Sequence, residues 1–209
     1  MSFSSKELPL VTSLSNTIES WPSMSGGEKT AAIAANMTSL ARPATRLIHE
    51  LNRDSKPTPA DIAASLAIML SDKADGLIAK HLGGKTEFGK EFDPLMDKFD
   101  FFIWEYAQYR RGQLALHHLV TRLGRDIAVT LVRSHVKGVT DGKVDVSAGW
   151  QGKASTAIRG ASLLATDTNA EQFVTRSVHQ NLVTAAIIAS GTANIKNLLD
   201  AKAEFELAA

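Results

Sequence analysis

The chain has 209 residues, of which 44% are hydrophobic, so it is long and apolar enough to form one domain with a proper core. Its formal net charge of +1 provides no large basic field, which leaves nucleic-acid binding without electrostatic support. No cysteine occurs, and this excludes disulfides, thiolate metal sites and cysteine nucleophiles.

Nearly the whole chain is predicted to be helical, because no window shows sustained period-two alternation of apolar residues. Breakers separate a short N-terminal helix from six longer helices, expected at about 29–51, 59–82, 87–111, 114–136, 151–164 and 170–203. A loop or small hairpin with an Asp141-Gly142 turn precedes the fifth of these. The predicted fold is all-α: a six-helix bundle over 31–209 as a single domain, preceded by a helix and linker over 1–30.

Hydropathy predicts a water-soluble protein. The N-terminus lacks a basic segment followed by an apolar one, so no signal peptide is expected. The apolar run Ile62–Ser71 is too short for a bilayer, which takes about 20 residues. The segment Phe92–Arg111 carries Asp100 and Glu105 near its middle, and each charge there opposes insertion by roughly 2.5–3.5 kcal/mol. The expected location is cytoplasmic, or peripheral at the cytoplasmic membrane.

Four aspartates recur at spacings of three and four on two consecutive predicted helices. The two stripes are Asp72, Asp75, Gly76 and Ala79 on the first helix, and Gly89, Asp93 and Asp97 on the second. Residues at these offsets share one helix face, and the Gly83-Gly84 break allows the helices to fold back antiparallel, with the stripes facing each other.

Four converging carboxylates repel one another by about 4 kcal/mol per pair at about 4 Å and an effective dielectric constant of about 20. Such a cluster must be protonated, paired with cations, or bound to metal. Oxygen-only ligands suit Mg²⁺ or Mn²⁺. The alternative is that these aspartates are the solvated faces of two amphipathic helices, in ion pairs with Lys80, Lys85, Lys90 and Lys98.

From Asp72 to Asp97 the sequence reads D-x2-D-G-x2-A-K-x8-G-x3-D-x3-D. This resembles the signature of the CDP-alcohol phosphatidyltransferases at seven of its eight fixed positions, with Lys80 where the family has arginine. Weaker similarities flank it. The segment NMTSLAR (36–42) is similar to the start of the family's first core helix. The segments RDIAVTLVR (125–133) and WQGKAST (150–156) resemble basic segments of its phosphatidylglycerophosphate synthase branch.

The resemblance implies a six-helix core that holds two divalent cations, Mg²⁺ or Mn²⁺, between its second and third helices. The implied metal ligands are Asp72, Asp75, Asp93 and Asp97, and Asp97 is also the implied general base. The metals would bind the diphosphate of a CDP-alcohol and neutralise the leaving CMP. Gly76, Ala79, Lys80 and Gly89 are the implied nucleotide-binding residues. Lysine at position 80 keeps the charge of the family's arginine but loses its bidentate geometry.

Three basic residues match family positions that hold the phosphate of the acceptor: Arg125, Arg133 and Lys153. They favour a phosphorylated polyol such as glycerol 3-phosphate, and the alternative is a purely structural role in ion pairs. The resemblance thus implies an enzyme that uses CDP-diacylglycerol and releases CMP, with homodimers as a further expectation.

The helices are unusually polar for this family, whose members are integral membrane proteins. A second hypothesis is therefore a water-soluble version of the fold, natural or redesigned, that keeps a metal or nucleotide site with little or no turnover.

Overall fold

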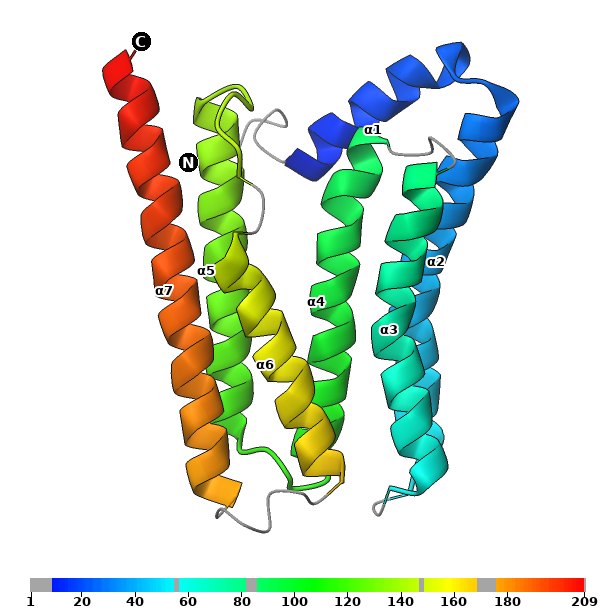
Figure 1. Cartoon of the computed structure of the whole chain (residues 1–209), viewed down its shortest axis with the longest axis vertical. Helices are drawn as coiled ribbons and strands as arrows, with labels where there is room; N and C mark the ends of the chain where they lie inside the picture. Colours follow the sequence, from blue (N-terminus) through cyan, green and yellow to red (C-terminus); the bar gives the residue numbers. More distant parts are fainter. Residues whose placement is uncertain (1–8, 55–56, 82–85, 147–148, 169–175, 209) are drawn as a thin grey trace. The chain divides into compact units, whose positions relative to one another are not determined.

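The computed structural model describes residues 9–54, 57–81, 86–146, 149–168 and 176–208, without the side chains of 9–11, 72–81 and 87. The described residues form seven α-helices and one 3-10 turn and contain no strand, which confirms the all-α prediction (Figure 1). The elements are α1 (Pro9–Ser20), η2 (Trp21–Ser23), α2 (Gly26–Asn52), α3 (Pro59–His81), α4 (Glu87–Arg110), α5 (Leu116–Val139), α6 (Trp150–Asp167) and α7 (Arg176–Ala208).

The loop between α5 and α6 contains the predicted tight turn. Asp141 and Gly142 both have positive φ values, of 49° and 70°. Glycine adopts this left-handed region without steric cost, and aspartate tolerates it better than most residues do. The alternative of a small hairpin is not formed by the described residues of this loop, which contain no strand.

A capping box starts α2 three residues before the predicted position. The Ser25 hydroxyl accepts a hydrogen bond from the Glu28 N–H at 3.3 Å, and the Ser25 N–H donates to Glu28 Oε2 at 2.7 Å. Each bond satisfies a backbone donor near the helix start, which favours the helix. The predicted linker up to residue 30 is therefore partly helical.

The capping box makes the stability of α2 dependent on pH. The Ser25 N–H, and then the Ser25 hydroxyl, lower the pKa of Glu28 below its ordinary 4.5, against a small opposing effect of burial. A carboxyl group with a lowered folded-state pKa stabilises the fold above its ordinary pKa, and this contribution is lost as pH falls through the folded value. We expect Glu28→Gln, which removes the titrating carboxylate, to lower the melting temperature at neutral pH and to differ less from wild type at about pH 3. Melting curves at both pH values test this, with Glu19→Gln, the same change at an exposed residue, as control; an equal difference at both pH values would contradict it.

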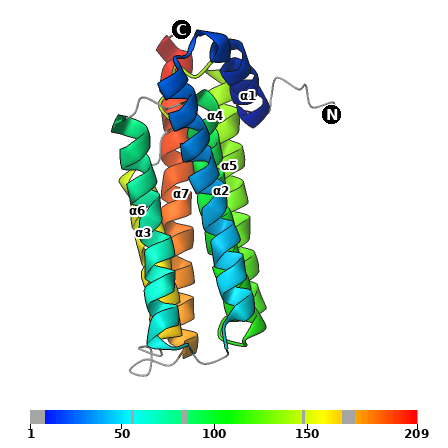
Figure 2. The same cartoon turned by 90° about the vertical axis from the view of Figure 1, so that its right-hand side faces the viewer.

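The structure comprises two compact units, Met1–Ala107 and Gln108–Ala209. In the first unit α2 and α3 pack together and run in opposite directions, while α4 runs in the same direction as α2 (Figures 1 and 2). In the second unit α7 packs on both α5 and α6. The single domain expected over 31–209 stays a prediction.

The short helix α1 is bonded to the start of α4. The Phe88 N–H donates to the buried Thr17 hydroxyl at 3.0 Å, and the Gly89 N–H donates to Thr86 Oγ1, also at 3.0 Å. The first N–H groups of a helix have no partner within the helix and must find acceptors elsewhere. Thr86 supplies one from the neighbouring sequence, and Thr17 supplies another from 71 residues away.

Many large apolar side chains lie on the surface of the helices. Exposed examples are Ile33, Met37, Leu40, Leu47 and Leu51 on α2, Leu116, Val120, Ile127 and Leu131 on α5, and Val178, Leu182, Ile188 and Leu199 on α7. No exposed residue is Asp, Glu, Lys or Arg in the described stretches 33–52, 59–71, 91–109, 115–139, 154–168 and 177–195. The surface of these stretches is thus apolar or uncharged.

Charged and polar side chains lie inside instead. Arg46, Glu105, Gln108 and Arg122 are fully buried, and so is nearly all of Asp100. The two acids that argued against membrane insertion from the sequence therefore face the interior. By length and composition, α7 is the one helix of the described chain that could cross a membrane. A shorter apolar stretch, Pro59–Ser71, lies in α3.

Candidate functional site

Three side chains of α2 bind three aspartates of α4. The pairs are Ser39 with Asp93, Arg42 with Asp97, and Arg46 with Asp100. We call these pairs the α2–α4 ladder. The ladder forms because the two helices run in the same direction and rise by the same amount per residue. The three residues of α2 are three and then four positions apart, and their partners on α4 are four and then three positions apart. Both sets therefore span seven positions and stay paired along the two helices.

The first two pairs hold two of the predicted metal ligands. The Ser39 hydroxyl donates to Asp93 Oδ1 at 2.5 Å, and Arg42 Nη1 donates to Asp97 Oδ1. Sequence reasoning placed Ser39 and Arg42 in the family-like segment NMTSLAR but assigned no role to either residue. Their partners are 54 and 55 residues away, so no local spacing could have indicated the contacts.

The aspartates of the ladder differ in their exposure to solvent. Arg46 donates through Nε and Nη2 to the two carboxylate oxygens of Asp100, at 3.1 and 3.3 Å, and its guanidinium lies 4.1 Å from the centre of the Trp104 ring. The side chains of Arg46 and Asp100 are 0% and 5% exposed. By contrast, the side chain of Asp97 is 37% exposed, although its partner Arg42 is only 5% exposed. A ligand can therefore reach the Asp97 carboxylate but not that of Asp100.

The other predicted metal ligands, Asp72 and Asp75, lie on α3, and their side chains are outside the described residues. The predicted nucleotide-binding residues of α3, Gly76, Ala79 and Lys80, likewise have no described side chains, and the Gly83-Gly84 break lies outside the described residues. The convergence of all four aspartates stays a prediction. Among side chains that are described, no three His, Asp or Glu residues form a group able to hold a metal ion.

Asp93 and Asp97 fit a divalent cation by their chemistry. They lie one turn apart on α4, both are partly accessible, and they offer only carboxylate oxygens. Mg²⁺ and Mn²⁺ prefer oxygen ligands and commonly use one or two carboxylates together with substrate phosphates. These two residues would hold such an ion, and Ser39 and Arg42 would orient them.

Gly89, the predicted nucleotide-binding residue on α4, lies where α4 comes close to α2. A Cβ atom at this position would be 3.2 Å from Thr86 Oγ1 and 3.3 Å from Asn36 Oδ1, closer than ordinary van der Waals contact. The absence of a side chain therefore lets the start of α4 approach Asn36, the first residue of the NMTSLAR segment.

The predicted acceptor-phosphate residues belong to the second unit. Arg125 and Arg133 lie on α5, and Lys153 lies exposed in the first turn of α6. Arg125 donates to Asp126 Oδ1 at 2.9 Å and to Ser190 Oγ at 3.1 Å. The Arg125 side chain lies against α7 at Gly191, where an added Cβ atom would be only 2.7 Å from it.

A second arginine shares the partner of Arg125. Arg159 on α6 donates through Nη1 to Asp126 Oδ2 at 2.5 Å, so one buried carboxylate lies between two guanidinium groups. Sequence reasoning missed Arg159, which lies three residues after the family-like segment WQGKAST. The two arginines thus come together at one acidic residue of α5.

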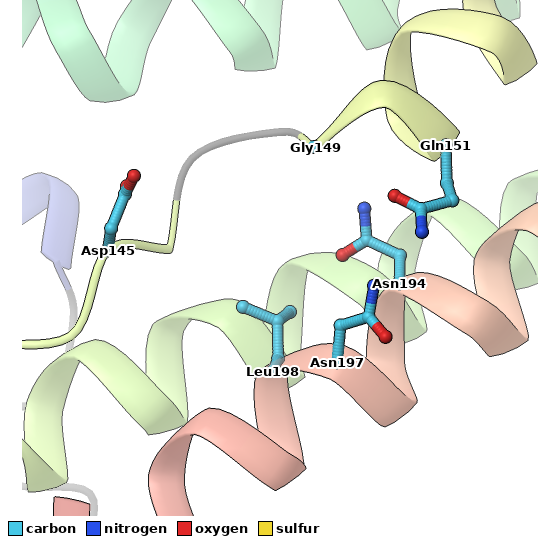
Figure 3. Close-up of a pocket in the computed structure, with 6 residues that line it drawn as sticks. All are labelled: Asp145, Gly149, Gln151, Asn194, Asn197 and Leu198. Carbon is cyan, nitrogen blue, oxygen red and sulfur yellow. The ribbon is translucent and has the colours of Figure 1, made fainter.

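A small pocket of about 100 Å³ lies in the second unit between the start of α6 and α7 (Figure 3). Its lining residues are Asp145, Gly149, Gln151, Asn194, Asn197 and Leu198. The amide side chains of Gln151 and Asn194 lie close to each other in Figure 3, whereas Asp145 lies on the loop before α6. None of the predicted site residues lines this pocket.

Comparison with known proteins identifies the family. The model of the CDP-alcohol phosphatidyltransferase family matches residues 32–191, which is most of the chain and includes every residue predicted for the site. A search of curated proteins finds no match to the chain. The match runs from the second turn of α2 into the middle of α7 and contains the whole α2–α4 ladder. This chain therefore belongs to the CDP-alcohol phosphatidyltransferase family.

Proposed function

We propose that this protein transfers a phosphatidyl group from CDP-diacylglycerol to the hydroxyl group of a phosphorylated polyol, such as glycerol 3-phosphate, and releases CMP. Membership of the family supports a phosphatidyl-transfer role in phospholipid synthesis. The observation that carries the finer proposal is the pair Asp93 and Asp97, accessible and oriented by α2, within a nearly complete family signature.

In the proposed reaction the acceptor hydroxyl oxygen bonds to the phosphorus that carries the diacylglycerol, and the bond from that phosphorus to the CMP phosphate breaks. Asp97 takes the proton of the hydroxyl group as general base, a role that its accessible carboxylate allows. Two divalent cations, when bound, would neutralise the diphosphate and the leaving CMP. Asp93 and Asp97 supply ligands from α4, and Asp72 and Asp75 are the proposed ligands from α3.

The acceptor is proposed to carry a phosphate because of the basic residues of the second unit. Arg125 shares the buried Asp126 carboxylate with a second arginine, Arg159, and Lys153 lies in the first turn of α6, where a helix N-terminus favours anions. Together with Arg133, these residues support the phosphatidylglycerophosphate synthase-like branch of the family as the proposed assignment.

We also propose that the protein is an integral membrane protein, as its family implies, and that the outer surface of its helices contacts lipid. The support is the distribution of described side chains: apolar residues lie outside, charged residues lie inside, and the six described stretches named above carry no exposed Asp, Glu, Lys or Arg. Charged residues within membrane-spanning segments typically face the protein interior. The water-soluble alternative, with little or no turnover, predicts that the chain stays in solution without detergent.

One assay tests this proposal. The chain is expressed, the cells are separated into membrane and soluble fractions, and detergent-purified protein is mixed with CDP-diacylglycerol and an acceptor. We expect the protein in the membrane fraction and CMP release with glycerol 3-phosphate, but not with glycerol or inositol. Adding EDTA should stop the release, and Mn²⁺ or Mg²⁺ in excess should restore it. A folded protein that releases no CMP with any of several CDP-alcohols would contradict the proposed reaction and favour the alternative.

A further inference from the structure

We propose that Arg42 is a built-in counterion of Asp97, which competes with a divalent cation for this carboxylate and thereby sets the affinity of the site for metal. This inference rests on the proposed function only in taking Asp97 as a metal ligand. It assigns a role to a residue of α2 that lies outside the signature.

The contact between Arg42 and Asp97 differs from the other two contacts of the α2–α4 ladder. Asp93 receives a neutral hydroxyl group from Ser39, so a cation that binds there meets no positive charge from this partner. Asp100 receives the guanidinium of Arg46, but both side chains are buried and no cation reaches them. Asp97 is both accessible and bonded to an arginine.

The burial of Arg42 makes this contact effective. Its side chain is 5% exposed, so water screens its charge poorly. A guanidinium group cannot lose its proton at physiological pH, so it cannot reduce the repulsion by becoming neutral. A divalent cation at Asp97 must therefore either displace the guanidinium from the carboxylate or bind beside a fixed positive charge. Both alternatives weaken metal binding relative to a site without Arg42.

The same contact holds Asp97 in position when no cation is bound. Without a positive partner, Asp93 and Asp97 would be two like charges one turn apart on α4, an arrangement that disfavours the helix. Arg42 thus stabilises the site before metal binds and opposes the metal when it binds. The two effects predict changes of opposite sign for one substitution, which a purely structural role does not.

The test is the binding of Mn²⁺ to the detergent-purified full chain, followed by the electron paramagnetic resonance signal of free Mn²⁺ without any CDP-alcohol or acceptor. Arg42→Gln keeps a hydrogen-bond donor but removes the charge. We expect it to bind Mn²⁺ at least about tenfold more tightly than wild type and to melt at a lower temperature without metal. Arg42→Lys, which keeps the charge, should restore an affinity close to that of wild type.

Arg53→Gln is the matched control, because it removes the same charge from the C-terminal end of α2, where Arg53 bonds Glu50 at 3.5 Å. It should leave the Mn²⁺ affinity unchanged. Unchanged or weaker Mn²⁺ binding by folded Arg42→Gln protein would overturn the proposal. If that variant does not fold, the Nε–H resonance of Arg42 in the wild-type chain decides: a shift on saturation with Mg²⁺ supports the competition, and an unmoved resonance overturns it.

These results are separable from the proposed function. Arg42→Gln can fail to tighten Mn²⁺ binding while the wild-type chain still releases CMP, and this result would remove only the role of Arg42. Conversely, a chain that binds Mn²⁺ as expected but releases no CMP would remove the reaction and leave the competition intact. A wild-type chain that binds no Mn²⁺ would overturn both the metal site and the competition.

Discussion

Replacing Asp97 by asparagine is expected to lower the rate of CMP release by at least about 1,000-fold, because the amide cannot accept a proton and is a poorer ligand for a divalent cation. Asparagine is nearly the same size as aspartate, and its side-chain oxygen still accepts a hydrogen bond from Arg42, so the ladder should keep its geometry. The measurement is the initial rate of CMP release with saturating CDP-diacylglycerol, glycerol 3-phosphate and Mn²⁺.

The matched control is Asp141→Asn, the same chemical change at an exposed turn of the second unit with φ of 49°, where asparagine is well tolerated. It should keep the rate of the wild type. Full activity of Asp97→Asn, sustained in the presence of a chelator, would refute both the general base and the metal requirement.

Replacing Arg46 by leucine is expected to destabilise the first unit by about 3–5 kcal/mol. The substitution leaves the Asp100 carboxylate buried without its cation, and it also removes the contact of the guanidinium with the Trp104 ring. A charge that is buried and unpaired costs far more than the net value of the pair, so the double variant Arg46→Leu/Asp100→Leu should recover most of the loss.

Unfolding in one detergent, monitored by circular dichroism, compares these variants. The control is Lys202→Leu, which breaks the exposed pair between Lys202 and Glu206 at 2.6 Å. An exposed pair of this kind contributes about 0–1 kcal/mol, so its loss should be barely measurable. A similar small effect for Arg46→Leu would show that water or another group satisfies Asp100 after the substitution.

The helices could be predicted from the sequence because their ends carry local signals. Glycine, proline and capping residues mark the breaks, and most predicted ends lie within a few residues of those observed. The larger errors lie at the ends of α5, α6 and α7, which continue three to five residues beyond the predicted positions, and Ser25 begins α2 three residues earlier than the apolar pattern suggested. The positions of Asp93 and Asp97 on one face of α4 also followed from their spacing alone.

The partners of these aspartates could not be predicted, because no spacing within one helix reveals which residues of another helix lie opposite. Ser39, Arg42 and Arg46 share one face of α2, but that pattern equally describes a solvated face. Only the packing of α2 along α4, in the same direction and in this register, pairs them with Asp93, Asp97 and Asp100.

A hydropathy average over a whole helix hides this distribution of side chains for a related physical reason. The mean hydropathy of α4 combines the buried Asp100 and Glu105 with the apolar residues on the outer side of the helix, although in a membrane only the outer side would contact lipid. The helix α4 then scores as polar, and so does α2, which contains the buried Arg42 and Arg46. A face-by-face average would have separated the two sides.

The hydrogen bond from Phe88 to Thr17 has a consequence for any shortened version of this protein. The family match begins at residue 32, so a fragment trimmed to that boundary would lack α1 and with it the acceptor that Thr17 offers to the first turn of α4. The helix that carries Asp93 and Asp97 would then begin with an unsatisfied amide. Recombinant fragments meant to preserve the acidic site should therefore retain residues 9–20, even though they fall outside the region by which the family is defined.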